Sequence, residues 1–164
     1  MTIDIRNDLP EFVAYIAKRV KEHLALANPA PVSRIDFGFE FGQSNWVALA
    51  FDTRENAEPD GSWSQGIDDI VFTRPNWPIW HELPEDETVF FIDVHGNKVN
   101  VMDDPDNLIC GIVGEAMKHA LLQARAAGVF KPLTKASKCE LGVENVEGYF
   151  GWPSYEDRGK ENLA

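Results

Sequence analysis

The sequence predicts an α+β fold in a single domain spanning 1–164, with a mainly antiparallel sheet and two amphipathic helices packed on one face of it. Three observations support this prediction. Two segments repeat apolar residues at helical spacing, two pairs of segments alternate apolar and polar residues on either side of short turns, and no internal repeat is present. Hairpins of this kind build antiparallel sheets, and amphipathic helices bury their apolar stripe against another layer.

The first helix is expected at 8–26. Asp8 is a suitable N-cap residue, and Glu11 three positions later completes a capping-box pattern. Apolar residues then recur every three or four positions: Leu9, Phe12, Val13, Ile16, Val20 and Leu24. Pro29 and Pro31 end the helix, because the residue before a proline disfavours the helical conformation.

A first hairpin is expected from 35–41 and 46–52. Apolar residues in its first strand alternate with Asp36, Gly38 and Glu40, the pattern of a half-buried strand. Pairing large side chains with small ones predicts the register. It places these residues opposite each other: Phe41 and Trp46, Phe39 and Ala48, Phe37 and Ala50.

A second hairpin is expected from 88–94 and 98–102, around a two-residue turn at Gly96-Asn97. This register forms an apolar face by pairing Val94 with Val99 and Ile92 with Val101. The last strands are expected at 138–144 and 149–152, on either side of a turn at Glu147-Gly148.

The second helix is expected at 105–127. Asp104 would cap it, Pro105 suits its first position, and Gly128 would end it. Its buried stripe comprises Leu108, Ile109, Ile112, Val113, Ala116, Met117, Ala120, Leu121 and Ala124. Gly111 and Gly114, within this stretch, predict close packing against the helix. The acidic run at 103–107 is accounted for by the helix start and lacks the glycine and distal glutamate of a calcium loop.

The segment at about 53–88 is irregular, acidic and rich in tryptophan and proline. Long irregular stretches inside a compact domain are uncommon and are usually functional. The chain has a net charge of −12, and the segment 52–106 holds fourteen acidic residues against three basic ones. This concentration argues against nucleic-acid binding and favours a basic protein partner.

No segment approaches the ~20 apolar residues of a membrane span, and the N-terminal residues lack the pattern of a signal peptide. We therefore expect a cytoplasmic protein without a membrane partner. Cys110 and Cys139 are expected to be buried, reduced thiols. Their spacing fits no zinc site, so we expect no metal and no cofactor.

No recognisable catalytic motif is present, and we assign no catalytic residue. His23 and His119 lie within the predicted helices and are expected to be structural. The alternative to a binding protein is a small hydrolase-like enzyme with a site around His81, Asp93 and His95. Asp93 and His95 would share one face of a strand and form a carboxylate–imidazole pair for acid–base chemistry.

Three tryptophans stand in the polar central segment, outside any periodic core pattern. They either anchor the segment on the core or line a protein-binding surface, where tryptophan is enriched. The second alternative defines a candidate partner-binding surface of acidic and tryptophan residues: Glu55, Glu58, Asp60, Trp63, Asp68, Asp69, Trp77 and Trp80.

Three stretches carry a family resemblance: FDTRENAEPDGSW (51–63), CELGVE (139–144) and WPSYEDRG (152–159). In these the chain resembles uncharacterised small acidic bacterial cytoplasmic proteins, some of which are thought to be immunity proteins of polymorphic toxin systems. The resemblance implies an immunity or antitoxin-like protein that neutralises a basic partner, such as a secreted toxin domain, by masking it. A scaffold or phage-related protein is a third alternative.

Overall fold

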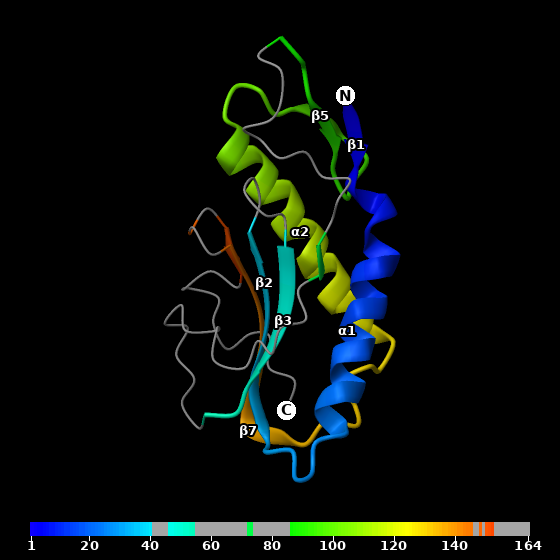
Figure 1. The fold of residues 1–164 in the computed structure, drawn as a ribbon, viewed down its shortest axis with the longest axis vertical. Coiled ribbons are helices and arrows are strands. Elements are labelled where there is room, and N and C mark those ends of the chain that lie inside the picture. Colours follow the sequence, from blue (N-terminus) through cyan, green and yellow to red (C-terminus); the bar gives the residue numbers. More distant parts are fainter. Residues whose placement is uncertain (41–45, 55–71, 74–85, 146–147, 149, 153–164) are drawn as a thin grey trace.

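The computed structural model describes residues 1–40, 46–54, 72–73, 86–145, 148 and 150–152 (Figure 1). These residues form an α+β fold, as predicted. The helices are α1 (Leu9–Leu24) and α2 (Pro105–Ala126), with a 3-10 helix (Ile5–Asn7) before α1. The strands are β1 (Thr2–Asp4), β2 (Val32–Glu40), β3 (Trp46–Asp52), β4 (Phe72–Thr73), β5 (Phe90–Ile92), β6 (Lys98–Asn100), β7 (Lys135–Asn145) and β8 (Gly151–Trp152).

The described strands form two sheets, so the prediction of a single sheet is wrong. The larger has the order β4-β3-β2-β7-β8, and the smaller has the order β1-β5-β6. Most pairs are antiparallel, but β2 pairs with β7 and β1 with β5 in parallel. Each parallel pair joins strands far apart in the sequence, which a pattern of local hairpins does not reveal.

Both helices lie on one side of the larger sheet, as predicted (Figure 1). Phe37 of β2 packs edge-on against Phe12 of α1, with ring centroids 5.8 Å apart, and stacks on Tyr15 at 6.1 Å. The backbone N–H of Leu49 in β3 donates a hydrogen bond to the Tyr15 hydroxyl oxygen at 3.3 Å. The core therefore sits between this sheet and the two helices, and the smaller sheet lies at one end of the molecule.

The register of the first hairpin differs from the prediction by one residue. Phe37 lies opposite Leu49 rather than Ala50, and Phe39 lies opposite Val47 rather than Ala48. A shift of one residue moves a whole strand to the other face of the sheet. The observed register places Val47 and Leu49 on the helix-facing side and the two alanines on the other. Phe41 lies outside the described residues.

The register of the second hairpin is also different. Phe91 lies opposite Val99 and Ile92 opposite Lys98, because the chain reverses over 93–97 rather than over two residues. The backbone N–H of Asp93 donates to the Asn97 carbonyl, and Gly96 has a φ of 88°. The buried residues of this region are consequently Val89, Phe91 and Val101, whereas Ile92 and Val94 are half-buried.

The helix predictions are confirmed in their main features, except that Leu24 of the predicted stripe of α1 is exposed. Every residue of the predicted stripe of α2 is buried except Leu108, which is half-buried. Gly128 follows the helix with a φ of 78°, a conformation that glycine adopts readily. Asp8 and Asp104 hold the N-cap positions without side-chain cap hydrogen bonds. The two carboxylate oxygens of Asp104 instead accept from the Asn107 side-chain amide at 3.1 and 3.0 Å.

The C-terminal strands are confirmed as an antiparallel pair. The predicted strand at 138–144 lies within β7, and β8 pairs with it through Val143 and Trp152. Gly148, at the predicted turn, has a φ of 86°.

Cys110 and Cys139 are buried thiols rather than a disulfide, as predicted.

Burial raises the pKa of Cys139 to about 11, because the apolar surroundings disfavour the thiolate. Compared with an unfolded cysteine of pKa 9.0, this leaves roughly 100-fold less thiolate at pH 8. We expect Cys139 to react with a thiol reagent at pH 8 only after unfolding in urea, with mass spectrometry locating the modification. Rapid labelling of Cys139 in the folded protein would contradict this prediction.

Candidate functional site

The residues assigned to partner binding from the sequence all lie outside the described residues. They are Glu55, Glu58, Asp60, Trp63, Asp68, Asp69, Trp77 and Trp80, and the same holds for His81 of the alternative enzymatic site. Their roles stay predictions. Asp93 and His95 lie in the turn between β5 and β6, so the prediction that they share one face of a strand is wrong.

Asp93 organises the turn of the second hairpin. Its carboxylate accepts hydrogen bonds from the backbone N–H groups of His95 at 2.9 Å and Asn97 at 2.8 Å, and from the Asn97 side-chain amide at 2.9 Å. Desolvation acts to raise the pKa of Asp93, but the hydrogen bonds from Asn97 and His95 together lower it. A carboxylate held in this way is a weak base and suits a structural role.

The His95 ring lies edge-on to the His119 ring of α2, with centroids 5.7 Å apart. The Nδ1 atom of His119 lies 3.0 Å from the Glu115 carbonyl oxygen, so it carries the proton when it donates this hydrogen bond. The two histidines thus join the hairpin turn to the middle of α2.

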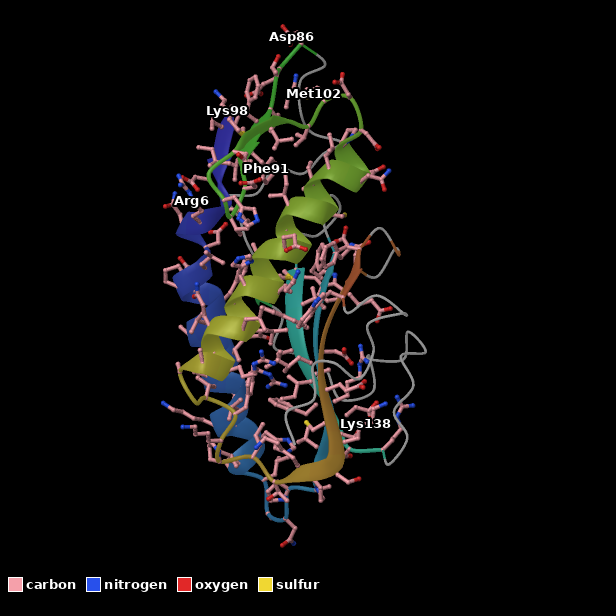
Figure 2. All side chains as sticks on the ribbon, turned by 180° about the vertical axis from the view of Figure 1, so that it is seen from behind. Arg6, Asp86, Phe91, Lys98, Met102 and Lys138 are labelled. Carbon is pink, nitrogen blue, oxygen red and sulfur yellow. The ribbon has the colours of Figure 1, made fainter. Side chains whose placement is uncertain are left out.

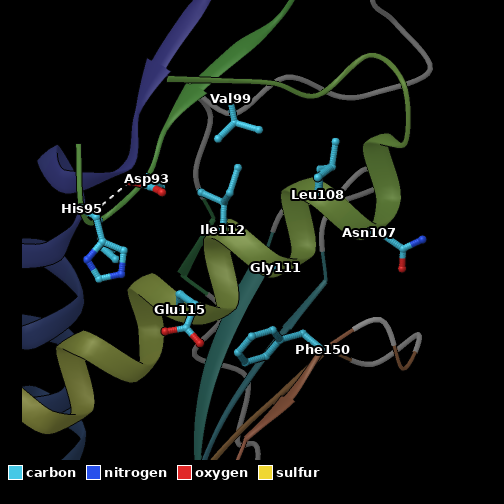
Figure 3. Close-up of a pocket in the computed structure, with 10 residues that line it drawn as sticks. Asp93, His95, Val99, Asn107, Leu108, Gly111, Ile112, Glu115 and Phe150 are labelled. Carbon is cyan, nitrogen blue, oxygen red and sulfur yellow. Dashed lines mark hydrogen bonds between the residues drawn. The ribbon is translucent and has the colours of Figure 1, made fainter. Parts of the chain in front are cut away.

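A pocket of about 330 Å³ lies between the second hairpin and the N-terminal half of α2 (Figure 3). Figure 3 shows Gly111 between Leu108 and Ile112 on one side and the Phe150 ring on the other. The lining is mainly apolar and comprises Val94, Val99, Leu108, Gly111, Ile112 and Phe150, together with the polar residues Asp93, His95, Asn107 and Glu115.

The two helical glycines have different surroundings. A Cβ atom at Gly114 would overlap the Phe150 ring, so close packing is confirmed there. Among the described residues, a Cβ atom at Gly111 would meet nothing within 4 Å, so the prediction of close packing is wrong for Gly111. A glycine inside a helix costs about 1 kcal/mol relative to alanine. At Gly111 this cost is not offset by packing, and the position instead forms part of the pocket wall.

The pocket lies beside the most acidic described part of the chain. Residues 86–106 carry six carboxylates and a single basic residue, Lys98. Asp103, Asp104 and Asp106 are exposed directly before the first lining residue of α2. Figure 2 shows Asp86 and Met102 at this same end of the molecule. We refer to the exposed carboxylates of Asp86, Asp103, Asp104 and Asp106 as the acidic end.

Glu115 adds a carboxylate to the pocket wall. Its oxygens lie 3.3 Å from Lys118 Nζ, and both side chains are partly exposed. Lys118 Nζ also lies 5.7 Å from the centre of the Trp152 ring. A partly exposed pair of this kind is weak and can exchange its partner.

A second group of charges is buried on the sheet face away from the helices. Arg34 Nε donates to the Asp36 carboxylate at 2.6 and 2.7 Å, and Arg34 Nη1 lies 3.7 Å from Glu140 Oε2 on β7. Lys138 Nζ lies 3.1 Å from the other Glu140 oxygen. The prediction of a half-buried strand is wrong here, because all nine residues of β2 are buried.

Gly142 makes room for this charged group. A Cβ atom at this position of β7 would overlap Asp36 and Arg34. Burial raises the pKa of Asp36, with contributions from Asp52 and Glu140, although Arg34 acts to lower it. Arg34 and Asp36 lie two residues apart in the sequence, which indicates that they share one face of β2. This spacing does not indicate that β7 is the neighbouring strand.

Among the described residues, no group of three or more His, Cys, Asp and Glu side chains is placed to hold a metal ion. No helix in the described ranges is both long enough and apolar enough to cross a bilayer.

Comparison with known protein families, with curated proteins and with solved structures finds no match to this chain. The fold and the site define an α+β protein with a small apolar pocket next to an acidic end.

Proposed function

We propose that this protein is a protein-binding module that holds a basic partner against its acidic end, as an immunity or antitoxin-like protein does when it masks a toxin. The observation that carries the proposal is the juxtaposition of the acidic end with an open apolar pocket. Clustered charge accelerates encounter with a partner of opposite sign, and an apolar pocket supplies contacts that slow dissociation. The turn hydrogen bonds of Asp93 favour binding over the alternative of acid–base catalysis.

The first test neutralises part of the acidic end with the triple variant Asp86→Asn, Asp103→Asn and Asp106→Asn. Immobilised wild-type protein should retain a basic partner from an extract of the native organism at low salt, and the triple variant should retain much less. With the purified partner, we expect association to slow by roughly tenfold at low salt while dissociation changes little, because steering by charge acts on encounter.

The matched control changes net charge by the same amount at the opposite end of the helices. Ala25, Ala27 and Ala126 are exposed there, so the variant Ala25→Lys, Ala27→Lys and Ala126→Lys should retain the partner. A retained partner that is acidic, or whose association rate is indifferent to salt and to both variants, would show that the proposal is wrong.

Co-expression tests the immunity part of the proposal separately. We expect the partner to arrest growth when its gene is expressed alone in bacteria. Growth should be restored when this protein is produced together with the partner. If a partner binds through the acidic end but does not affect growth, the protein is a binding module and the proposed immunity role is wrong.

A further inference from the structure

We propose that the pocket between the second hairpin and α2 receives one arginine side chain of the basic partner, and that Gly111 keeps the pocket open for it. This inference rests on the proposed function, because it names the chemical group by which the partner is anchored.

The size and lining of the pocket suit the stem of a long side chain. A volume of about 330 Å³ lies at the lower end of the ~300–1,000 Å³ range of ligand pockets, which favours a single side chain over a large cofactor. Val99, Leu108 and Ile112 supply apolar surface on one side. The alkyl stem of an arginine buries against such a surface while its charged head stays at the edge.

The charges around the pocket suit the head group. The Glu115 carboxylate and the Phe150 ring both border the pocket (Figure 3). A guanidinium group can bind a carboxylate through two parallel hydrogen bonds and can also lie over an aromatic ring. Lys118 makes only a partly exposed pair with Glu115, so an arriving guanidinium can take its place.

Gly111 supplies an independent argument. Gly114 in the same helix is required by the contact of Phe150, but no described residue comes within 4 Å of a Cβ atom built at Gly111. Any larger residue at 111 except proline would favour the helix and would fill the space beside Ile112. Glycine, the least favourable helix residue other than proline, lines the pocket here and leaves room for a ligand at some expense of stability.

The pocket can be tested with a short peptide and without the natural partner. The probe is acetyl-Gly-Arg-Gly-amide, and the matched probe replaces arginine by citrulline, which has a nearly identical shape and no charge. Titrating ¹⁵N-labelled protein, we expect saturable shifts in the amide signals of Val99, Gly111 and Glu115 with the arginine peptide. The citrulline peptide should bind at least about tenfold more weakly, because it loses the charge-assisted hydrogen bonds to Glu115.

Gly111→Leu fills the pocket without changing any charge and places a good helix former in α2. We expect this variant to fold, to unfold at a temperature no lower than the wild type, and to lose the shifts caused by the arginine peptide. Ala126→Leu, an exposed position near the end of the same helix, is the control and should keep them. Equal binding of the two peptides, or binding that survives Gly111→Leu, would overturn the inference.

The natural partner then separates the two proposals. Gly111→Leu should speed dissociation by at least about tenfold and leave the salt dependence of association unchanged, because the acidic end is intact. Unchanged dissociation would overturn the pocket inference while the charge-based function stands. Peptide binding at the pocket, together with no basic protein retained by the wild type, would support the pocket chemistry and overturn the proposed function.

Discussion

Replacing Arg34 by methionine should destabilise the fold by about 3–5 kcal/mol near neutral pH, the range found when one partner of a buried ion pair is removed. The Asp36 carboxylate would lose the cation that donates to both of its oxygens, and it would remain buried. Glu140 would lose its cross-strand attraction to the same guanidinium. Urea unfolding of the wild type and the variant at pH 7.5 measures this difference.

The destabilisation caused by Arg34→Met should shrink as the pH falls. Burial already raises the pKa of Asp36 above its unfolded value of about 3.9, and removing Arg34 raises it further. A carboxyl group with a raised native pKa takes up a proton on folding. Its unfavourable contribution is therefore complete above the native pKa and is progressively relieved as the pH falls through that pKa toward the unfolded value. Repeating the unfolding measurement at pH 5 should give a smaller difference than at pH 7.5.

The control for Arg34→Met is Arg6→Met. Arg6 makes an equally short contact with Asp4, at 2.6 Å, but its side chain is 47% exposed. Solvent weakens a pair of this kind, so the unfolding free energy of the Arg6 variant should stay close to that of the wild type at both pH values. If the two variants behaved alike, the buried charges on β2 and β7 would contribute no more than a surface pair does.

Phe37→Ala should destabilise the protein by about 3–5 kcal/mol, the range for truncating a fully buried phenylalanine. The Phe37 side chain is fully buried and touches Phe12 and Tyr15, so its loss opens a cavity between β2 and α1. The midpoint of urea unfolding should fall while the dependence of the unfolding free energy on urea concentration stays the same, because the surface exposed on unfolding hardly changes.

Phe51→Ala is the matched control for Phe37→Ala. Phe51 lies on the same face of the sheet but is only half-buried and packs on His23, with centroids 4.7 Å apart. The destabilisation caused by Phe51→Ala should be clearly smaller than that caused by Phe37→Ala. Should Phe37→Ala fail to fold, Phe37→Leu can replace it, because it leaves a smaller cavity. Its destabilisation should still be larger than that of Phe51→Ala. Equal losses at the two positions would contradict the placement of the core between β2 and α1.

The helices and the positions of most strands could be predicted because their signals are local. Leu9, Phe12 and Ile16 recur at helical spacing in any context, and Gly128 ends a helix by its own conformational freedom. The pairing of strands is not local in this sense. Phe37 is compatible with either Leu49 or Ala50 as far as size is concerned, and only the position of α1 decides which of these two buried residues faces the helices.

The second hairpin shows how a single side chain can change a register. Gly96-Asn97 is a good two-residue turn. However, the Asp93 carboxylate accepts hydrogen bonds from the backbone N–H groups of His95 and Asn97, and these stabilise a five-residue turn instead. An aspartate four positions before an asparagine was the signal that could have indicated it.

The pocket was only partly predictable. Asp93, His95 and Gly111 were singled out from the sequence, but Val99, Leu108 and Phe150 join them only because the smaller sheet lies beside α2. Nothing in the spacing of these residues brings the hairpin, the helix and the chain just before β8 together. The partner-binding residues assigned to 53–88 lie outside the described residues, so that assignment stays a prediction.

The parallel pairing of β2 with β7 has a consequence for how the chain folds. The Asn145 side-chain amide donates to the Phe39 carbonyl across this pair at 3.3 Å, joining residues 106 positions apart. Contacts so distant in sequence require a long loop to close before they contribute any stabilisation, and they slow folding. Until β7 arrives, β2 can pair with β3 through a short connection while its other edge stays open. An open edge of alternating phenylalanines is a template for another chain, so folding of this protein competes with aggregation at the centre of its own sheet.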